Sequence, residues 1–156
     1  MSASAVETRP PTAADIDELA ANLRQQDRDE LDAAGHRDHR AVIADGVARS
    51  DWCLTALIDG RVACIFGVAS MATLLDPRGI PWMLGTDLVP VHRRAFVRLA
   101  PHYIRRMLQD YPHLVNVVHA RNTLAVRWLQ RAGFALRPAH LHNGEPFHVF
   151  EMTRRV

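Results

Sequence analysis

The chain has 156 residues and a formal net charge of +2 at pH 7; 48% of its residues are hydrophobic and 23% are charged. This balance is typical of one globular domain and excludes an intrinsically disordered chain. No apolar stretch reaches the ~20 residues that a membrane-spanning helix needs, and the first residues lack the basic and apolar segments of a signal peptide. We therefore expect a single domain over residues 1–156, with a loose tail at 1–5, that is not secreted.

All 19 cationic side chains are arginines, which excludes Schiff-base chemistry and a lysine general base. Residues 1–46 hold ten acidic residues and five arginines, whereas residues 47–156 hold seven acidic residues and fourteen arginines. This asymmetry predicts a basic half that attracts an acidic partner protein. Nucleic acid is a less favoured partner, and a solvated helix face is the simplest alternative. The candidate contact residues are Arg93, Arg94, Arg98, Arg105 and Arg106.

Local signals in the first half of the chain predict a strand, three helices and a hairpin. Thr12 and Asp15 have the spacing of a helix N-terminus, before apolar residues at helical spacing. Asp59-Gly60 is typical of a two-residue hairpin turn, which would place Thr55 opposite Cys64. The expected elements are a strand at 5–9, a helix after Thr12, helices at 27–34 and 37–49, and strands at 52–58 and 61–70.

The second half continues the alternation of strands and helices. Pro101 indicates a break between a short turn at 92–99 and a helix at 101–110, because proline is disfavoured inside a helix. Asn122 is a good N-cap for a helix that Gly133 ends. The whole pattern predicts the α/β class, with a single central mixed sheet flanked by helices. The remaining expected elements are a loop at 74–81, strands at 82–86 and 114–119, and a hairpin of 134–138 with 146–152 around Asn143-Gly144.

The segment from Asn122 to Phe134, NTLAVRWLQRAGF, is the most specific motif in the chain. It resembles the N-x-x-A-x-x-x-Y-x-x-x-G-F stretch of the GCN5-related N-acetyltransferases (GNATs), and the order of elements is similar too. The resemblance implies a GNAT fold, in which the asparagine contacts the pantetheine of acetyl-CoA and the tyrosine often protonates the leaving thiolate.

The chain departs from the GNAT pattern at two places. Leu129 stands at the tyrosine position and has no proton to give. The glycine-rich phosphate loop of the family, aligned on Pro90 and Arg93, has large residues at its three small positions: Arg94, Phe96 and Arg98. Small residues there let backbone N–H groups approach a pyrophosphate. These departures predict weak or absent binding of acetyl-CoA.

A narrower resemblance covers roughly residues 6–152. The segments that carry it include RPPTAADIDEL from Arg9, WMLGTD from Trp82, ARNT from Ala120, and GEPFH from Gly144. They are similar to the internal virion protein A family of short-tailed bacteriophages and related prophages, whose members share the acetyltransferase-like fold. This resemblance implies a role in virion assembly, inside the virion or in the host cytoplasm.

Several residues are candidates for chemistry. Asp87, His92 and His119 are weak candidates for proton transfer, with helix capping as the simpler role for Asp87. Arg93, Arg94 and Asn122 are weak candidates for cofactor binding, since arginine pairs with phosphate and asparagine with an amide. The spacing of His36 with His39, and of His140 with His142, matches no standard zinc site, so we expect no metal.

The sequence therefore predicts an internal virion or assembly protein whose acetyltransferase-like fold is degenerate for catalysis. Its expected partners are other virion or assembly proteins, with no membrane partner and no confidently assigned cofactor. The first alternative is an N-acetyltransferase that uses acetyl-CoA, and the second is a basic module that binds nucleic acid.

Overall fold

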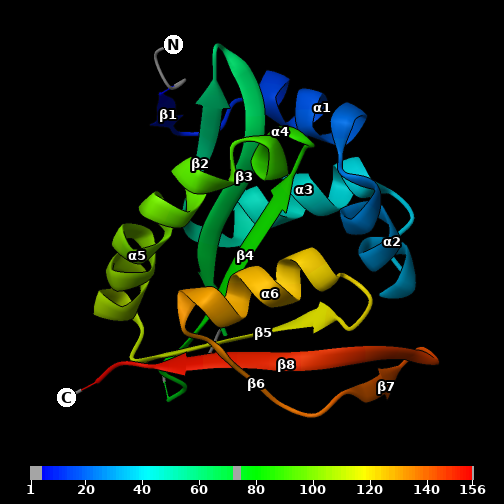
Figure 1. Ribbon diagram of the computed structural model, residues 1–156, viewed down its shortest axis with the longest axis vertical. Helices are drawn as coiled ribbons and strands as arrows, with labels where there is room; N and C mark the ends of the chain where they lie inside the picture. Colours follow the sequence, from blue (N-terminus) through cyan, green and yellow to red (C-terminus); the bar gives the residue numbers. More distant parts are fainter. Residues whose placement is uncertain (1–4, 72–74, 156) are drawn as a thin grey trace.

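The computed structural model describes residues 5–71 and 75–155 and shows one mixed sheet with helices on both faces (Figure 1). The strand order is β1-β2-β3-β4-β5-β8-β6, with β7 also paired to β8, and only β4 and β5 run parallel. This architecture confirms the predicted fold class. The elements are β1 (Val6–Arg9), α1 (Ala13–Asn22), α2 (Gln25–Ala33), α3 (His39–Arg49), β2 (Ser50–Ile58), β3 (Arg61–Ser70), β4 (Arg78–Gly85), α4 (Leu88–Val91), α5 (Arg93–Asp110), β5 (His113–His119), α6 (Thr123–Ala132), β6 (Ala135–Leu136), β7 (His140–His142) and β8 (Glu145–Thr153).

The helices cover the two faces of the sheet with separate apolar clusters. On one face α1 and α3 bury Leu19 and Ile43 against β2, β3 and β4. On the other face α5 and α6 bury Ile104 and Leu129 against β3, β5 and β8. Figure 1 shows α6 in front of the sheet and α3 behind it. None of the described helices is long and apolar enough to cross a membrane. Residues 1–4 of the predicted tail lie outside the described residues.

The N-terminus of α1 is fixed by a buried carboxylate. Asp15 accepts hydrogen bonds from the backbone N–H of Thr12 at 3.0 Å and from the Thr55 hydroxyl at 2.9 Å. Both its oxygens also pair with the guanidinium of Arg9. The Thr12 hydroxyl in turn accepts from the Asp15 N–H, which completes the capping box that the spacing predicts. This network joins β1, α1 and β2.

The hairpin of β2 and β3 forms around Asp59-Gly60, but its predicted register is wrong beyond the first two pairs. Leu57 lies opposite Val62 as the turn requires, and then Ala56 lies opposite Cys64. Thr55 therefore faces Ile65 rather than Cys64. The cause is a bulge at Ala63, whose carbonyl accepts the N–H of Thr86 at 2.8 Å. Contact with another part of the chain shifts the register here.

Two prolines are tolerated where the sequence predicts a break. α5 runs unbroken over 18 residues although Pro101 lies inside it. Pro101 is exposed, so the Val97 carbonyl that loses its donor also lies on a half-exposed turn open to water. Similarly, β4 begins at Arg78, inside the predicted loop, because Gly79 and Pro81 pair with β3. Leu74, where that predicted loop starts, lies outside the described residues.

The C-terminal elements follow their local signals. The Asn122 side chain accepts the Ala125 N–H at the start of α6, and Gly133 ends the helix with φ of 102°. Asn143 and Gly144 both have positive φ in the turn between β7 and β8. The predicted partner strand at 134–138 is shorter, because β6 and β7 pair with different parts of β8.

We expect the Asp15→Asn variant to lose about 2 kcal/mol of unfolding free energy at pH 7, because buried hydrogen bonds to a charged group are lost. Burial alone would raise the pKa of Asp15, but hydrogen bonds from Arg9, Thr12 and Thr55 outweigh it and hold the pKa below its ordinary value of 3.8. The contribution of the carboxylate is therefore present above pH ~4 and fades as the pH falls through the folded-state pKa.

Urea denaturation at several pH values measures this effect. The matched control is Asp17→Asn on the same helix, which removes an exposed ion pair with Arg40 and should cost less than about 1 kcal/mol. Equal losses in the two variants would contradict the assigned role of Asp15.

Candidate active site

The sheet opens between β4 and β5. These parallel strands pair only at their first residues, Arg78 with His113 and Gly79 with Leu114. Beyond that point Pro81 offers no N–H, and its carbonyl accepts the side-chain amide of Asn116 at 2.8 Å instead of a strand partner. The rest of β4 and β5 diverge, which leaves a wedge-shaped opening in the middle of the sheet.

The far end of β4 is held by the corner between α1 and α2. Asp27 accepts the N–H of Gly85 at 2.9 Å, and the Gly85 carbonyl accepts the N–H of Arg24 at 2.9 Å. The Arg24 guanidinium donates to Asp27 at 3.0 Å, and both side chains are more than 90% buried. The backbone groups of Gly85 are thus satisfied by a helix corner, and the opening persists.

Asn122 lies at this polar base of the opening. Its Oδ1 accepts from Arg24 at 3.3 Å as well as from the helix backbone. The residue is 3% exposed, and its Nδ2 makes no hydrogen bond of normal geometry with the described residues, although the Glu30 carboxylate lies near it. A buried amide that lacks an acceptor is costly, so this donor indicates a place for an oxygen atom of a ligand.

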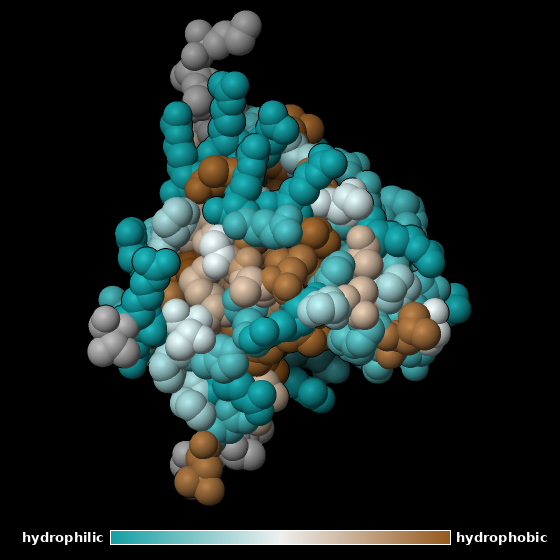
Figure 2. Space-filling view, turned by 60° about the horizontal axis from the view of Figure 1, so that its bottom comes forward, coloured by the Kyte–Doolittle hydropathy of each residue, from teal (hydrophilic) through white to brown (hydrophobic). Residues whose placement is uncertain are grey.

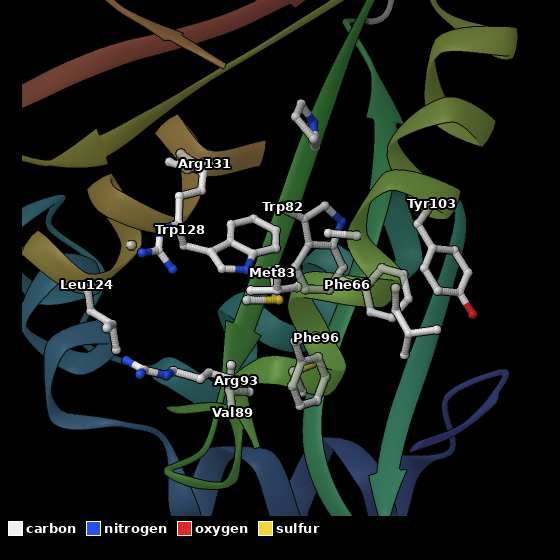
Figure 3. Close-up of a pocket in the computed structure, with 18 of the residues that line it drawn as sticks. Phe66, Trp82, Met83, Val89, Arg93, Phe96, Tyr103, Leu124, Trp128 and Arg131 are labelled. Atoms are coloured by element: carbon white, nitrogen blue, oxygen red, sulfur yellow. The ribbon is translucent and has the colours of Figure 1, made fainter. Parts of the chain in front are cut away.

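A cavity of about 660 Å³ fills the opening and continues between α5 and α6. Figure 3 shows Trp128 of α6 directed toward Met83 of β4, with Phe66, Phe96 and Tyr103 gathered on the α5 side. Figure 2 shows the same arrangement at the surface, as an apolar hollow surrounded by long hydrophilic side chains. Apolar walls with a few polar groups at the base are typical of a small-molecule site.

The mouth of the cavity is cationic. Arg93 of α5 lines it and reaches toward Leu124 (Figure 3), and Arg127 and Arg131 of α6 line it as well. All three arginines are exposed, and none has an ion-pair partner within residues 5–71 and 75–155. Free guanidinium groups at the mouth of an apolar cleft suit a ligand with phosphate groups.

Glu30 of α2 is a functional candidate that the sequence analysis missed. Burial raises the pKa of its carboxyl to about 7, although a hydrogen bond from the His119 N–H opposes this rise. Glu30 lines the 660 Å³ cavity and also a second cavity of about 390 Å³. Its spacing from Arg24 and Asp27, three residues each, places all three on one helix face, and this was the signal available in the sequence.

His119 is positioned as a structural residue. Its Nδ1 accepts the Arg121 N–H at 3.0 Å, so Nε2 carries the proton and donates to Glu145 at 3.0 Å. The side chain is buried and has no free ring nitrogen for proton transfer. The structure therefore brings together Arg93 and Asn122 among the six predicted site residues, with His119 beside them.

The other predicted residues lie away from the two cavities. Asp87 is exposed and precedes α4 without a side-chain cap, and His92 lies between α4 and α5. Arg94 and Arg98 are exposed, and neither lines a cavity in the described part of the chain. Phe96, by contrast, lines the first cavity and packs against Cys64, Val89 and their neighbours.

No group of residues suited to a metal occurs within the described ranges. Of the arginines predicted to meet an acidic partner, Arg105 is exposed and Arg106 lies over the Trp52 ring at 4.1 Å. Binding of such a partner stays a prediction.

Solved structures with a similar fold include several acetyltransferases. The acetyltransferase from Agrobacterium tumefaciens str. C58 has a TM-score of 0.69 and 15% identity, covering 96% of this chain and 91% of that chain. An aminoglycoside acetyltransferase in complex with coenzyme A has a TM-score of 0.67 and 14% identity, covering 96% and 95%. A GNAT-family acetyltransferase from Streptococcus pneumoniae has a TM-score of 0.60 and 15% identity, covering 96% and 100%.

Comparison of the sequence with models of protein families and with curated proteins finds no match. The prediction of an internal virion protein is contradicted, because the similar structures are acetyltransferases and several were crystallised with coenzyme A. The segments that carried that resemblance include determinants of the fold, such as the Thr12 cap and the Asn122 cap. The chain has the GNAT fold, and nothing supports the virion family.

Removing the charge of Glu30 should stabilise the fold at high pH. In the folded state its pKa is about 7 against an ordinary value of 4.5, so ionisation is penalised by folding. The parent protein should lose stability as the pH rises from about 4.5 to about 7, by on the order of 1–3 kcal/mol. We expect Glu30→Gln to melt at a higher temperature than the parent at pH 8 and at nearly the same temperature at pH 4.5.

Differential scanning calorimetry at the two pH values measures the difference. Asp110→Asn, at the exposed C-terminus of α5, serves as the control and should show no such dependence on pH. A lower melting temperature of Glu30→Gln at pH 8 would mean that the carboxylate is paired and not merely buried.

Proposed function

We propose that this protein is an N-acetyltransferase that uses acetyl-CoA as its donor. The observation that supports this most strongly is the opening between β4 and β5, with the unpartnered Asn122 amide at its base and free arginines at its mouth. An elongated ligand with polar groups along its length and phosphates at one end matches these features. The GNAT fold of the chain agrees with the proposal.

The opening suits the pantetheine arm of coenzyme A. Beyond Gly79, β4 pairs with β3 on one side and has no strand partner on the side of β5, where Trp82 and Met83 line the cavity. Successive backbone groups of a strand point to opposite sides, so those of Met83, like those of Gly85, face away from β3. An extended chain with amide groups pairs readily with such a free strand edge. The Nδ2 of Asn122 then supplies a donor for a carbonyl oxygen of the ligand.

The phosphate groups would be recognised by charge rather than by a glycine-rich loop. Phe96 packs into the core, so it contributes apolar wall to the cavity, while Arg93 stays free at the N-terminus of the 18-residue helix α5. A helix N-terminus favours anions, and guanidinium groups bind phosphate through paired hydrogen bonds. The arginines thus offset the missing glycines at the positions of Arg94, Phe96 and Arg98.

The transfer needs no side-chain acid at the position of Leu129. Leu129 is buried in the apolar cluster between α5, α6 and the sheet, so it forms part of the cavity wall and takes no part in the reaction. An alkyl thiol has a pKa near ~8.5, so the sulfur of the donor leaves as a thiolate without prior protonation at neutral pH. What the site must supply is a position for the thioester and a group that accepts the proton of the amine.

Calorimetric titration with acetyl-CoA tests the proposal. We expect a dissociation constant in the micromolar range, about 8 kcal/mol of binding free energy. The double variant Arg93→Ala/Arg131→Ala should weaken binding at least tenfold and reduce its dependence on salt. The control is Arg49→Ala, which removes an exposed arginine from α3 on the opposite face. Absence of binding at millimolar acetyl-CoA would exclude the proposed function.

The role of the Asn122 amide is tested separately with Asn122→Ser. Serine keeps a capping oxygen for α6 but lacks the amide donor. We expect the variant to bind acetyl-CoA about five- to tenfold more weakly, the value of roughly one hydrogen bond, with a melting temperature close to that of the parent. Unchanged affinity would show that this donor does not meet the ligand.

A further inference from the structure

The second cavity, of about 390 Å³, lies on the far side of the polar base of the opening. It is lined by α2 and by the segment that joins β5 to α6, and Glu145 of β8 closes it. Glu30 and Asn122 line both cavities, so the two spaces meet at these side chains. In contrast to the apolar first cavity, charged and polar residues dominate this one: Gln26, Asp29, Glu30, Asp32, Arg37, His119, Arg121, Asn122 and Glu145.

The carboxylates of the second cavity are not all neutralised. Glu145 pairs with His119 and Arg121, and Asp32 pairs with His39 at 2.8 Å. Among the described residues, Asp29 accepts from the neutral amide of Gln25, and Glu30 accepts from the His119 backbone N–H and lies within reach of the Asn122 amide. The cavity therefore retains negative charge at its rim, at Asp29, and at its base, at ionised Glu30, and Arg37, which makes no ion pair with the described residues, also lines it.

Asn122 gives an independent indication of what lies at the junction. Its unpartnered Nδ2 is buried beside the Glu30 carboxylate, at the wall that the two cavities share. A ligand carbonyl that accepted from this donor would have its electrophilic carbon within reach of a nucleophile that enters from the second cavity.

We propose that the second cavity binds the acceptor, a small primary amine that carries an additional positive charge, and that Glu30 takes the proton from the reacting ammonium group. This inference rests on the proposed function and adds the substrate class and the base. Asp29 would hold the distal positive charge, while the reacting nitrogen lies at Glu30 beside the thioester.

The ammonium group gives one proton to the Glu30 carboxylate, and the neutral amine uses its lone pair to form a C–N bond with the thioester carbon. The C–S bond breaks and its electron pair leaves on sulfur as a thiolate. The nitrogen then gives its second proton to the thiolate, directly or through water, and Glu30 returns its own proton to solvent. The products are the acetamide, free coenzyme A and one proton.

The surroundings of Glu30 suit it to this step near neutral pH. Burial raises its pKa most and the neighbouring Asp27 adds to this, whereas the His119 N–H, Arg24 and the Asn122 amide lower it, and the net pKa is about 7. A base with this pKa is ionised at pH 8, and its conjugate acid still releases a proton readily. The other charged or titratable groups that line the cavity are Asp29, Asp32 and Arg37 from α2 and its end, His119 and Arg121 beyond β5, and Glu145 from β8.

The experiment compares acceptors and variants in one assay of coenzyme A release. The probes are cadaverine with two positive charges, butylamine with one, and β-alanine with a carboxylate. We expect kcat/KM to be at least tenfold higher for cadaverine than for β-alanine, with butylamine between them. Asp29→Asn should lower the value for cadaverine about fivefold and leave that for butylamine unchanged, and Asp110→Asn should change neither.

Glu30→Gln tests the base. The substitution keeps an oxygen that accepts the His119 N–H, and it should lower kcat/KM for cadaverine about 100-fold at pH 8. It should also remove the rise of activity around pH 7 and leave the affinity for acetyl-CoA unchanged, as measured by calorimetry.

The outcomes separate the two proposals. Failure to bind acetyl-CoA overturns the proposed function itself. If acetyl-CoA binds, three results would overturn the inference about the acceptor and leave the donor site intact. One is that β-alanine is as good an acceptor as cadaverine, and another is that no amine is turned over. The third is that Glu30→Gln keeps full activity and an unchanged pH profile.

Discussion

The structure depends on which groups form hydrogen bonds with the backbone N–H and carbonyl of Gly85. In a continuous sheet the end of β4 would hydrogen-bond to β5, but here Arg24 and Asp27 take both the carbonyl and the N–H of Gly85. Pro81 removes a further donor from the same strand, and Asn116 satisfies its carbonyl. The separation of β4 from β5 therefore costs no buried, unpaired backbone groups at these positions. The cavity exists because a helix corner, instead of a neighbouring strand, satisfies the hydrogen-bonding groups at the end of β4.

The same corner sets the electrostatics of the site. Arg24 and Asp27 are a buried ion pair, a type of interaction that adds little stability but is costly to break on one side only. Burial, and to a smaller extent the charge of Asp27, disfavours a second negative charge nearby, which is why the pKa of Glu30 rises to about 7. A fold-determining contact and a titratable group thus occupy one helix face. Ionised Glu30 destabilises the fold, and in our proposal the same carboxylate serves as the base at the junction of the two cavities.

The sequence was informative where the signal is local. The caps at Thr12 and Asn122 and the turn at Asp59-Gly60 depend on a few neighbouring residues, and they formed as predicted. Predictions failed where distant contacts decide, as in the register beyond the bulge at Ala63. Glu30 was missed because its burial arises from β5 and α6, which are far away in the chain. The prediction of a virion protein failed for the same reason, because it rested on motifs in the sequence, whereas the cleft exists only in the folded chain.

The central claim is that the opening between β4 and β5 receives the acetyl donor. Titration of acetyl-CoA into ¹⁵N-labelled protein, followed by amide NMR, tests it most directly. We expect large shifts at the Asn122 side-chain amide and at the backbone amide of Met83, with little change in α3. Shifts confined to the surface arginines, with the Asn122 amide unmoved at saturation, would contradict it.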